Sequence, residues 1–332
     1  MANYAIFDEQ YYLASYPWLK PAIDAGIIKS GREHFETFGQ AAGLTQVSRY
    51  FDEATYLAGN PDIASFVRTP NNPNAPFATG LDHFIQFGYE EGRTRVSPDY
   101  DEAFYLKKYP VLAPFVENGT FKSGFEHFVK FGSKEGLYAN TFFEAQYLLQ
   151  NPAVATAVKA GDFQTGGEHY RKFGQFEPDR TATFFGTSGN DILTGFGVGN
   201  VELIGVEVGV NINGGREYKS RGSDEFDTLI GGSGSDTFVL GRTLLTTNSI
   251  GKLLSVDELL YQGPGFATIQ NFTQGQDRIQ LVFGYQYSIF PINNNRDLAI
   301  QVGSDTLAVI EGGGNLSLNQ LPAFGELRTL LG

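Results

Sequence analysis

The sequence predicts a multidomain α + β protein, in which an N-terminal array of four two-helix repeats is followed by a β-domain. The four histidines of the 332-residue chain all fall at one place in a recurring unit. A unit that recurs every ~40–50 residues indicates a repeat array. Beyond residue 182, helix signals give way to glycine, asparagine, aspartate and β-branched residues, which are typical of turns and short strands.

The recurring unit begins with Ser or Thr, then Gly, and has an acidic residue immediately before the histidine. Ser or Thr with an acidic residue three positions later forms a capping box, which predicts the start of a helix. Each unit ends on Phe-Gly, where glycine favours a C-cap. The aromatic residue after the histidine and the Phe of Phe-Gly are expected to share one helical face. The four histidines are His34, His83, His127 and His169.

A second motif precedes each histidine and predicts the first helix of each repeat. In Phe7-Asp8-Glu9, Asp8 is expected to cap the helix, while Pro17 ends it or opens the next one. The fourth copy departs from the pattern, because Phe143 stands where the others have aspartate. One such module cannot bury its aromatic face alone, so neighbouring modules must stack. The expected modules are residues 5–48, 49–98, 99–140 and 141–182, which together form a helical domain over 1–182.

The recurring histidines allow a functional and a structural interpretation. A zinc site needs several ligands around one ion, whereas each module offers a single histidine. A packing role is needed in every module and a catalytic role only once, so the structural interpretation is favoured. The recurring tyrosines are expected to pack between modules, with the hydroxyl reaching a backbone group. These tyrosines are Tyr12, Tyr56, Tyr105 and Tyr147.

The net charge, the lack of cysteine and the lack of long apolar runs argue against several classes of partner and site. A formal net charge of −13 argues against nucleic acid or an anionic membrane, since both attract basic surfaces. The chain has no cysteine, which excludes disulfides and thiolate metal sites. The N-terminal segment lacks the features of a Sec-type signal peptide, and no apolar run approaches the ~20 residues of a membrane span. We therefore expect no membrane insertion.

The C-terminal half contains glycine-aspartate nonapeptides. The segment 231–239, Gly-Gly-Ser-Gly-Ser-Asp-Thr-Phe-Val, matches the pattern G-G-x-G-x-D-x-U-x in full, and 186–194 and 222–230 match it with one or more substitutions. Here the chain resembles the RTX (hemolysin-type) calcium-binding family. The resemblance implies an RTX-like β-roll or β-sandwich over 183–332. The segments 297–302 and 306–310 read as a β-hairpin that caps this domain.

The resemblance also implies calcium as a cofactor, because stacked glycine turns offer carbonyl and carboxylate oxygens. Two repeats after Asp191 the aspartate position falls on Gly209, and two before Asp236 it falls on Tyr218, so few complete ion sites are expected. The alternative is that these aspartates only cap turns. The candidate calcium ligands are Asn190, Asp191, Asp224, Asp227 and Asp236.

The N-terminal modules are similar to short aromatic-Asp/Tyr-Leu repeats that accompany RTX segments in bacterial, notably cyanobacterial, proteins. Members of the RTX family leave the cell by type I secretion, with an uncleaved C-terminal signal. The sequence contains no G-x-S-x-G, H-E-x-x-H or Walker-type motif, so we expect no enzyme.

These features favour a non-enzymatic structural or adhesive protein of the cell surface or an extracellular matrix or filament, stabilised by Ca²⁺. Protein partners or self-assembly are expected. One alternative is an intracellular scaffold in the cytoplasm, whose helical repeats dock proteins in a larger complex. The other alternative is a hydrolase with an unrecognised site.

Overall fold

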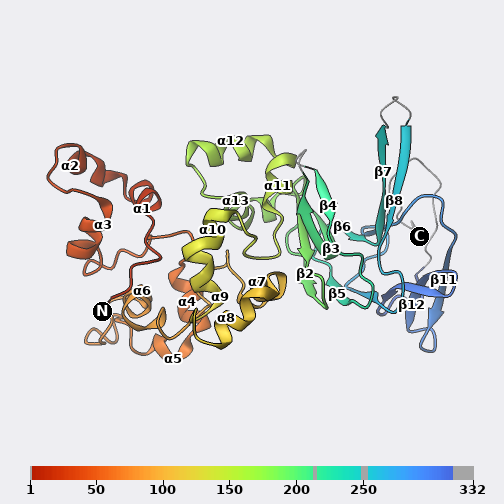
Figure 1. The fold of residues 1–332 in the computed structure, drawn as a ribbon, viewed down its shortest axis with the longest axis horizontal. Helices are drawn as coiled ribbons and strands as arrows, with labels where there is room; N and C mark the ends of the chain where they lie inside the picture. The colour runs from red at the N-terminus through yellow and green to blue at the C-terminus, as the bar shows by residue number, and fades with distance from the viewer. Residues whose placement is uncertain (1, 212–214, 248–252, 317–332) are drawn as a thin grey trace. The chain divides into compact units, whose positions relative to one another are not determined.

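The computed structural model describes residues 2–211, 215–247 and 253–316, so the end of the predicted β-domain lies outside the described residues. The chain contains both helices and β-sheets, which confirms the mixed α + β class (Figure 1). It divides into two compact units, Met1–Asn140 and Thr141–Gly332. The helical modules predicted over 5–140 fall in the first unit, and the fourth module shares the second unit with the β-domain.

The first unit consists of short helices. They are α1 (Glu9–Ser15), α2 (Lys20–Asp24), α3 (Gly31–His34), α4 (Glu53–Gly59), α5 (Pro61–Ala64), α6 (Gly80–His83), α7 (Glu102–Lys108), α8 (Ala113–Glu117), α9 (Gly124–His127) and α10 (Ser133–Glu135). Helices α3, α6 and α9 each continue into one π-helical turn, namely Phe35–Gly39, Phe84–Gly88 and Phe128–Gly132. Short 3₁₀ turns span Pro17–Leu19 and Pro110–Leu112.

The helices begin where their capping residues predict. The Asp8 carboxylate accepts a hydrogen bond from the Tyr11 N–H at 3.0 Å, and Asp52 and Asp101 cap α4 and α7 in the same way. Ser30 accepts from the Glu33 N–H at the start of α3. The proline of each module opens the next helical segment, as at Pro17 and Pro61.

Buried aromatic rings hold the first unit together. Its core runs continuously from Ile6 to Phe128. Contacts cross between modules: the rings of Tyr50 and Phe128 lie 4.8 Å apart, centroid to centroid. The module boundaries are therefore packed interfaces, because no module contains enough apolar surface for a core of its own.

The second unit begins with α11 (Glu144–Gln150), α12 (Pro152–Ala160) and α13 (Gly166–Lys172), followed by a short 3₁₀ turn (Gly174–Phe176). Helix α11 packs on β1 (Thr181–Gly186), and α12 and α13 pack on α11. The Phe143 ring is buried and lies 5.3 Å from the Phe185 ring in β1, centroid to centroid. This contact explains why the fourth module has phenylalanine where the others have a capping aspartate.

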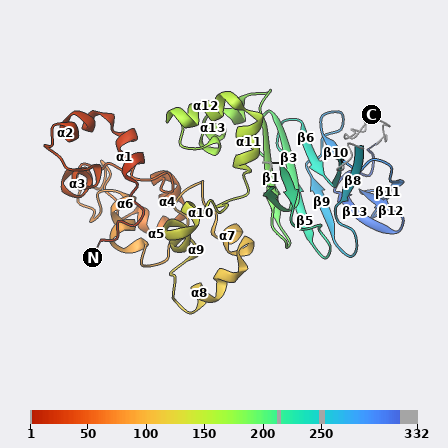
Figure 2. The same ribbon diagram turned by 45° about the horizontal axis from the view of Figure 1, so that its top comes forward.

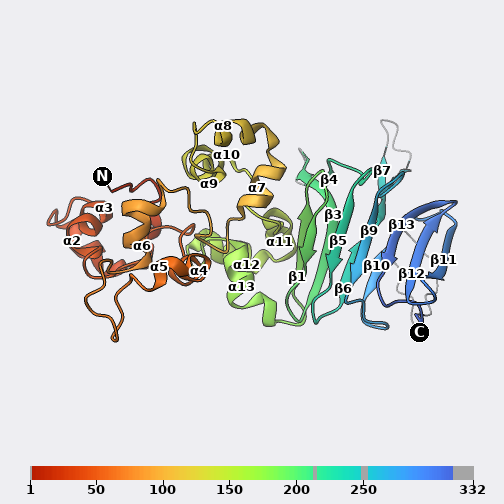
Figure 3. The ribbon, with the colours of Figure 1, turned by 90° about the horizontal axis from the view of Figure 1, so that it is seen from below.

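Two larger sheets and one two-stranded sheet follow in the described part of the second unit (Figure 2). The first contains the parallel strands β1, β3 (Asn200–Val210), β6 (Asp236–Val239) and β10 (Arg278–Gln280). The second contains the parallel strands β2 (Ile192–Thr194), β5 (Phe226–Ile230), β9 (Phe266–Gln270) and β13 (Asp305–Ile310). Each successive strand of these two sets thus belongs to the other sheet. Figure 3 shows the strands side by side.

Three insertions interrupt this alternation. The strand β4 (Arg216–Tyr218) pairs with the end of β3, and β7 (Gly241–Thr247) with β8 (Leu253–Leu259) forms a projecting hairpin (Figure 1). The strands β11 (Tyr287–Ile292) and β12 (Asp297–Val302) extend the second sheet beside β13. The antiparallel pairing of β12 with β13 confirms the predicted C-terminal hairpin.

Candidate functional site

The recurring tyrosine and histidine of each module meet in the interior. The tyrosine hydroxyl hydrogen-bonds Nδ1 of the histidine, at 2.9 Å for Tyr12–His34, 2.7 Å for Tyr56–His83, 2.9 Å for Tyr105–His127 and 2.9 Å for Tyr147–His169. The expectation that the tyrosine hydroxyl reaches a backbone group is therefore wrong. A buried imidazole nitrogen needs a polar partner, and the tyrosine of the same module supplies it.

The glycine of Phe-Gly makes room for this tyrosine. A Cβ atom on Gly39 would lie 2.5 Å from the Tyr12 hydroxyl, and one on Gly174 would lie 2.5 Å from the Tyr147 hydroxyl. Gly39 is not among the glycines with positive φ and lies inside the π-helical turn. The predicted C-cap role is thus wrong. The glycine is needed because the tyrosine hydroxyl lies close to its backbone and leaves no room for a side chain.

A recurring glutamate, which the sequence analysis did not single out, joins the two helices of each module. The Glu9 carboxylate accepts from the N–H groups of Gly31 at 2.6 Å and Arg32 at 2.9 Å, at the start of α3. Glu53, Glu102 and Glu144 make the same pair of hydrogen bonds. The sequence does indicate a role for this glutamate. It is present in all four modules, including the fourth, where phenylalanine stands in place of the capping aspartate.

Burial keeps the histidines neutral. Desolvation lowers the pKa of each ring, because the charged form is disfavoured away from water. Aromatic rings flank each histidine: His34 lies between Trp18 and Phe38, and His169 between Phe163 and Phe173. This geometry supports a packing and hydrogen-bonding role.

The Phe of Phe-Gly faces outward. The aromatic residue directly after each histidine is buried, as expected, but the second Phe is not. The exposed fractions are 62% for Phe38, 48% for Phe87, 47% for Phe131 and 51% for Phe173. The expectation that the two aromatic residues share one helical face is wrong, because the first faces the interior and the second faces outward. Each module consequently presents one half-exposed phenylalanine ring beside its histidine.

The candidate calcium ligands separate onto two edges of the β-domain. Because the alternating strands are parallel within each sheet, turns that lead from the first sheet to the second lie at one edge, and the return turns lie at the other. Asn190 and Asp191 precede β2, Asp224 precedes β5 and Asp227 lies near the start of β5, all at the first edge. Asp236 begins β6 at the return edge, so the five residues do not form one group.

At the first edge, aspartate oxygens hold the turns. The Thr187 N–H donates to Asp191 Oδ2 at 2.6 Å. The Asp191 N–H donates to Asp227 Oδ1 at 2.8 Å, and the Tyr261 hydroxyl donates to Asp227 Oδ2 at 2.6 Å. Asn190 Oδ1 accepts from the Phe226 N–H at 2.8 Å. These side-chain oxygens accept hydrogen bonds from the turns. This is the turn-capping role that the sequence offered as the alternative to calcium binding.

At the return edge, two carboxylates are buried together. Asp236 is 0% exposed, and neither of its oxygens has a hydrogen-bond partner of normal geometry. Its N–H donates to Asp277 Oδ1 at 2.9 Å. Burial, and next the charge of Asp277, raise the pKa of Asp236 to about 7, against a smaller opposing effect of the Gly232 N–H. Asp277 was not among the predicted ligands.

The carbonyl groups beside Asp236 already accept hydrogen bonds. Asn271 Nδ2 donates to the carbonyls of Gly231 at 2.8 Å and Gly232 at 2.9 Å, and Gln276 donates to those of the next two residues. Among the described residues, no three His, Asp or Glu side chains converge in a way that could hold a metal ion. At the first edge, Asn190, Asp191 and Asp227 already accept hydrogen bonds within or between the turns. Asp236 with Asp277 offers buried negative charge that an ion or a proton can neutralise.

Within the part of the chain that the structure describes, no helix combines the length and apolar character needed to cross a bilayer. No model of a known protein family, no curated protein and no solved structure matches this chain.

Proposed function

We propose that this chain is a non-enzymatic structural or adhesive protein of the cell surface or an extracellular matrix or filament. The observation that carries the proposal is the half-exposed phenylalanine that every module presents, at Phe38, Phe87, Phe131 and Phe173. The histidine and tyrosine beside it are engaged with each other inside the module. Four copies of one outward-facing aromatic group suit repeated contacts with protein partners or with further copies of the chain.

The proposed architecture is an array of four two-helix repeats joined to an RTX-like β-roll. Support for the repeats comes from the recurrence of the same glutamate, tyrosine–histidine and glycine contacts in each module. Support for the β-roll comes from strands that alternate between two parallel sheets and are linked by glycine-rich turns.

Calcium has a stabilising role in this proposal. A divalent ion beside Asp236 and Asp277 would neutralise two buried carboxylates, whose desolvation in the folded protein is costly without a counter-ion. Export by type I secretion belongs to the same proposal, since such chains cross the envelope unfolded and bind calcium outside the cell.

The test replaces the four phenylalanines together by serine. The wild-type protein, the four-Phe→Ser variant and a Phe283→Ser control are applied to cells of the source organism and to the isolated cell-surface material. Phe283 is 59% exposed and lies outside the modules, so it matches the exposure of the substituted rings. Retention of the wild type and the control, with loss of the four-fold variant, is expected. Equal retention of all three proteins would refute an adhesive role for these rings.

Fractionation of a culture into medium, surface and cytosol separates this proposal from its closest alternative. Recovery from the medium or the surface is expected. Recovery only from the cytosol, within a larger complex, would favour the intracellular scaffold.

A further inference from the structure

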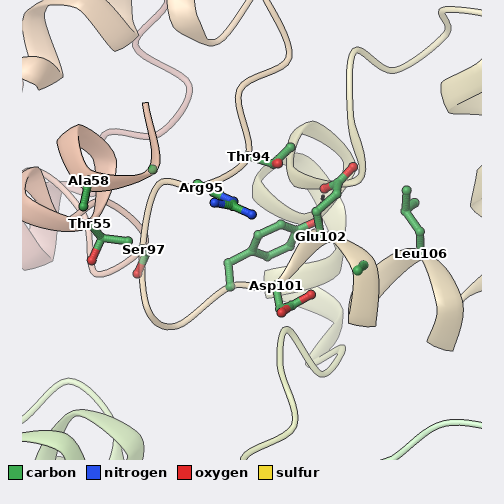
Figure 4. Close-up of a pocket in the computed structure, with 11 residues that line it drawn as sticks. Thr55, Ala58, Thr94, Arg95, Ser97, Asp101, Glu102 and Leu106 are labelled. Carbon is green, nitrogen blue, oxygen red and sulfur yellow. Dashed lines mark hydrogen bonds between the residues drawn. The ribbon is translucent and has the colours of Figure 1, made fainter. Parts of the chain in front are cut away.

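The first unit has a cavity of about 650 Å³ between the second and third modules, and this cavity is open to solvent. It is lined by residues of α4, of the link that follows the second module and of the start of α7, namely Thr55, Ala58, Gly59, Thr94, Arg95, Ser97, Tyr100, Asp101, Glu102, Ala103 and Leu106. Figure 4 shows Arg95 between Thr55 and Ala58 on one side and Glu102 and Leu106 on the other.

The cavity arises where the second module departs from the repeat. In the first module, the Tyr11 hydroxyl donates to Gln46 Oε1 at 2.7 Å, so that the two side chains are held together. The equivalent positions in the second module carry Thr55 and Arg95. Threonine is much smaller than tyrosine, and it leaves both the space and the arginine side chain open.

Gly59 fixes the direction of the arginine. A Cβ atom on Gly59 would lie 2.5 Å from the Arg95 Cβ, so the aliphatic stem of Arg95 lies directly against the helix backbone. Asn60 Nδ2 also donates to the Arg95 carbonyl at 3.4 Å. The guanidinium is thereby directed to the cavity.

Throughout the described ranges, no side chain or backbone group forms an ion pair or hydrogen bond with the Arg95 guanidinium. Its neighbour Arg93 is paired with Asp62 and Glu91. The carboxylate of Glu102, on the wall of the cavity, already accepts from the N–H groups of Gly124 and Phe125 and from the Tyr100 hydroxyl. Asp101 Oδ1 caps the start of α7. Arg95 is thus an exposed positive group that lines the cavity, while the acidic side chains beside it accept hydrogen bonds from other groups.

We propose that this cavity binds a monocarboxylate ligand, with Arg95 as the group that recognises the carboxylate. A guanidinium presents two parallel N–H donors that match the two oxygens of a carboxylate. The side chains of Ala58 and Leu106 offer apolar contact to the body of the ligand, and the hydroxyls of Thr55 and Thr94 offer further hydrogen bonds. The charges of Asp101 and Glu102 disfavour a dianion such as phosphate. The inference goes beyond the proposed adhesive function and is independent of the exposed phenylalanines.

The test is a titration of the full-length, ¹⁵N-labelled protein, followed by NMR. Benzoate is the probe, and benzyl alcohol is its uncharged counterpart. Shifts of the Gly59 amide and the Arg95 Nε–H signal with benzoate alone are expected. No response to benzoate up to about 50 mM, or equal responses to both compounds, would overturn the proposal, and this comparison needs no variant.

Two variants locate the site. Arg95→Gln and Thr55→Tyr each introduce the residue that the first module has at the equivalent position, and the two changes together recreate its Tyr–Gln pair. Each is expected to weaken benzoate binding by about tenfold or more, the first by removing the charge and the second by filling the cavity. Binding that is unchanged in Arg95→Gln would overturn the assignment of the carboxylate to this residue.

A further titration distinguishes two kinds of carboxylate ligand, a peptide C-terminus and a small organic acid. A short peptide of uncharged residues is titrated with a free C-terminus and with an amidated one. Tighter binding of the free-acid peptide than of benzoate would assign the site to a peptide C-terminus. Binding of benzoate alone would assign it to a small molecule.

Discussion

The hydroxyl oxygen of Tyr56 lies 2.7 Å from Nδ1 of His83, and both side chains are buried in the second module. Because the pair recurs in every module, the histidine marks a structural position in each repeat. Burial raises the pKa of the tyrosine and lowers that of the histidine, so both stay neutral in the fold.

Replacement of Tyr56 by phenylalanine is expected to destabilise the first unit by about 1–3 kcal/mol, because it leaves a buried imidazole nitrogen unpaired. His83→Phe should cost a similar amount, and the double variant less than the sum of the two. Urea unfolding of the four proteins forms a double-mutant cycle. If the losses of stability in the two single variants add up to the loss in the double variant, the hydrogen bond between the two side chains is not the source of the destabilisation. His83→Phe should also leave any calcium response of the second unit unchanged.

Stability is expected to fall on acidification below about pH 6.5, the ordinary pKa of histidine. The folded pKa of each histidine is lowered by burial, so the unfolded chain takes up protons first as pH falls. A comparison of the wild type with His34→Gln isolates this contribution, since their other titrating groups are the same. The stability advantage of the wild type should shrink between pH 7 and pH 5. A difference that is independent of pH would contradict a lowered pKa at His34.

Gly39→Ala tests the close approach beside Tyr12. The added methyl group would lie 2.5 Å from the tyrosine hydroxyl, so we expect a cost of about 1–3 kcal/mol from overpacking. The same substitution in a Tyr12→Phe background is the control, because the hydroxyl is then absent and the nearest atom to the methyl group is Phe35 Cδ2 at 3.1 Å, so a smaller cost is expected. A cost that is equal in the two backgrounds, measured by thermal unfolding, would show that the glycine is needed for another reason.

Asp236→Asn tests the buried carboxylate at the return edge. Without calcium at pH 8, the variant is expected to be more stable than the wild type by about 1–3 kcal/mol, because it removes an unpaired buried charge. Addition of Ca²⁺ should raise the Tm of the wild type and have a smaller effect on the variant. Asp224→Asn, at the other edge, is the matched control and should respond to calcium as the wild type does. An equal rise in all three proteins would place the calcium effect elsewhere.

Local sequence signals predicted the helices and the hairpin well, since caps act over a few residues. Asp8, Ser30 and Pro17 stand where the helices begin, and the β12–β13 hairpin follows its turn. The partners of Tyr56 and Phe143 could not be predicted, because each lies on another element of the fold. The contact between Asp236 and Asp277 could not be predicted from the nine-residue period of the glycine-aspartate repeats. The β7–β8 hairpin lies between the two residues in the chain and interrupts that period.

The most direct test of the account removes the exposed rings one at a time. Phe38, Phe87, Phe131 and Phe173 are replaced by serine singly, in pairs and all together, and retention on the cell surface of the source organism is measured for each protein. Each half-exposed ring can contribute about 1 kcal/mol on burial, so each loss should weaken retention several-fold, and the losses should multiply. Retention of the four-fold variant at the wild-type level, with its folding intact, would contradict the account.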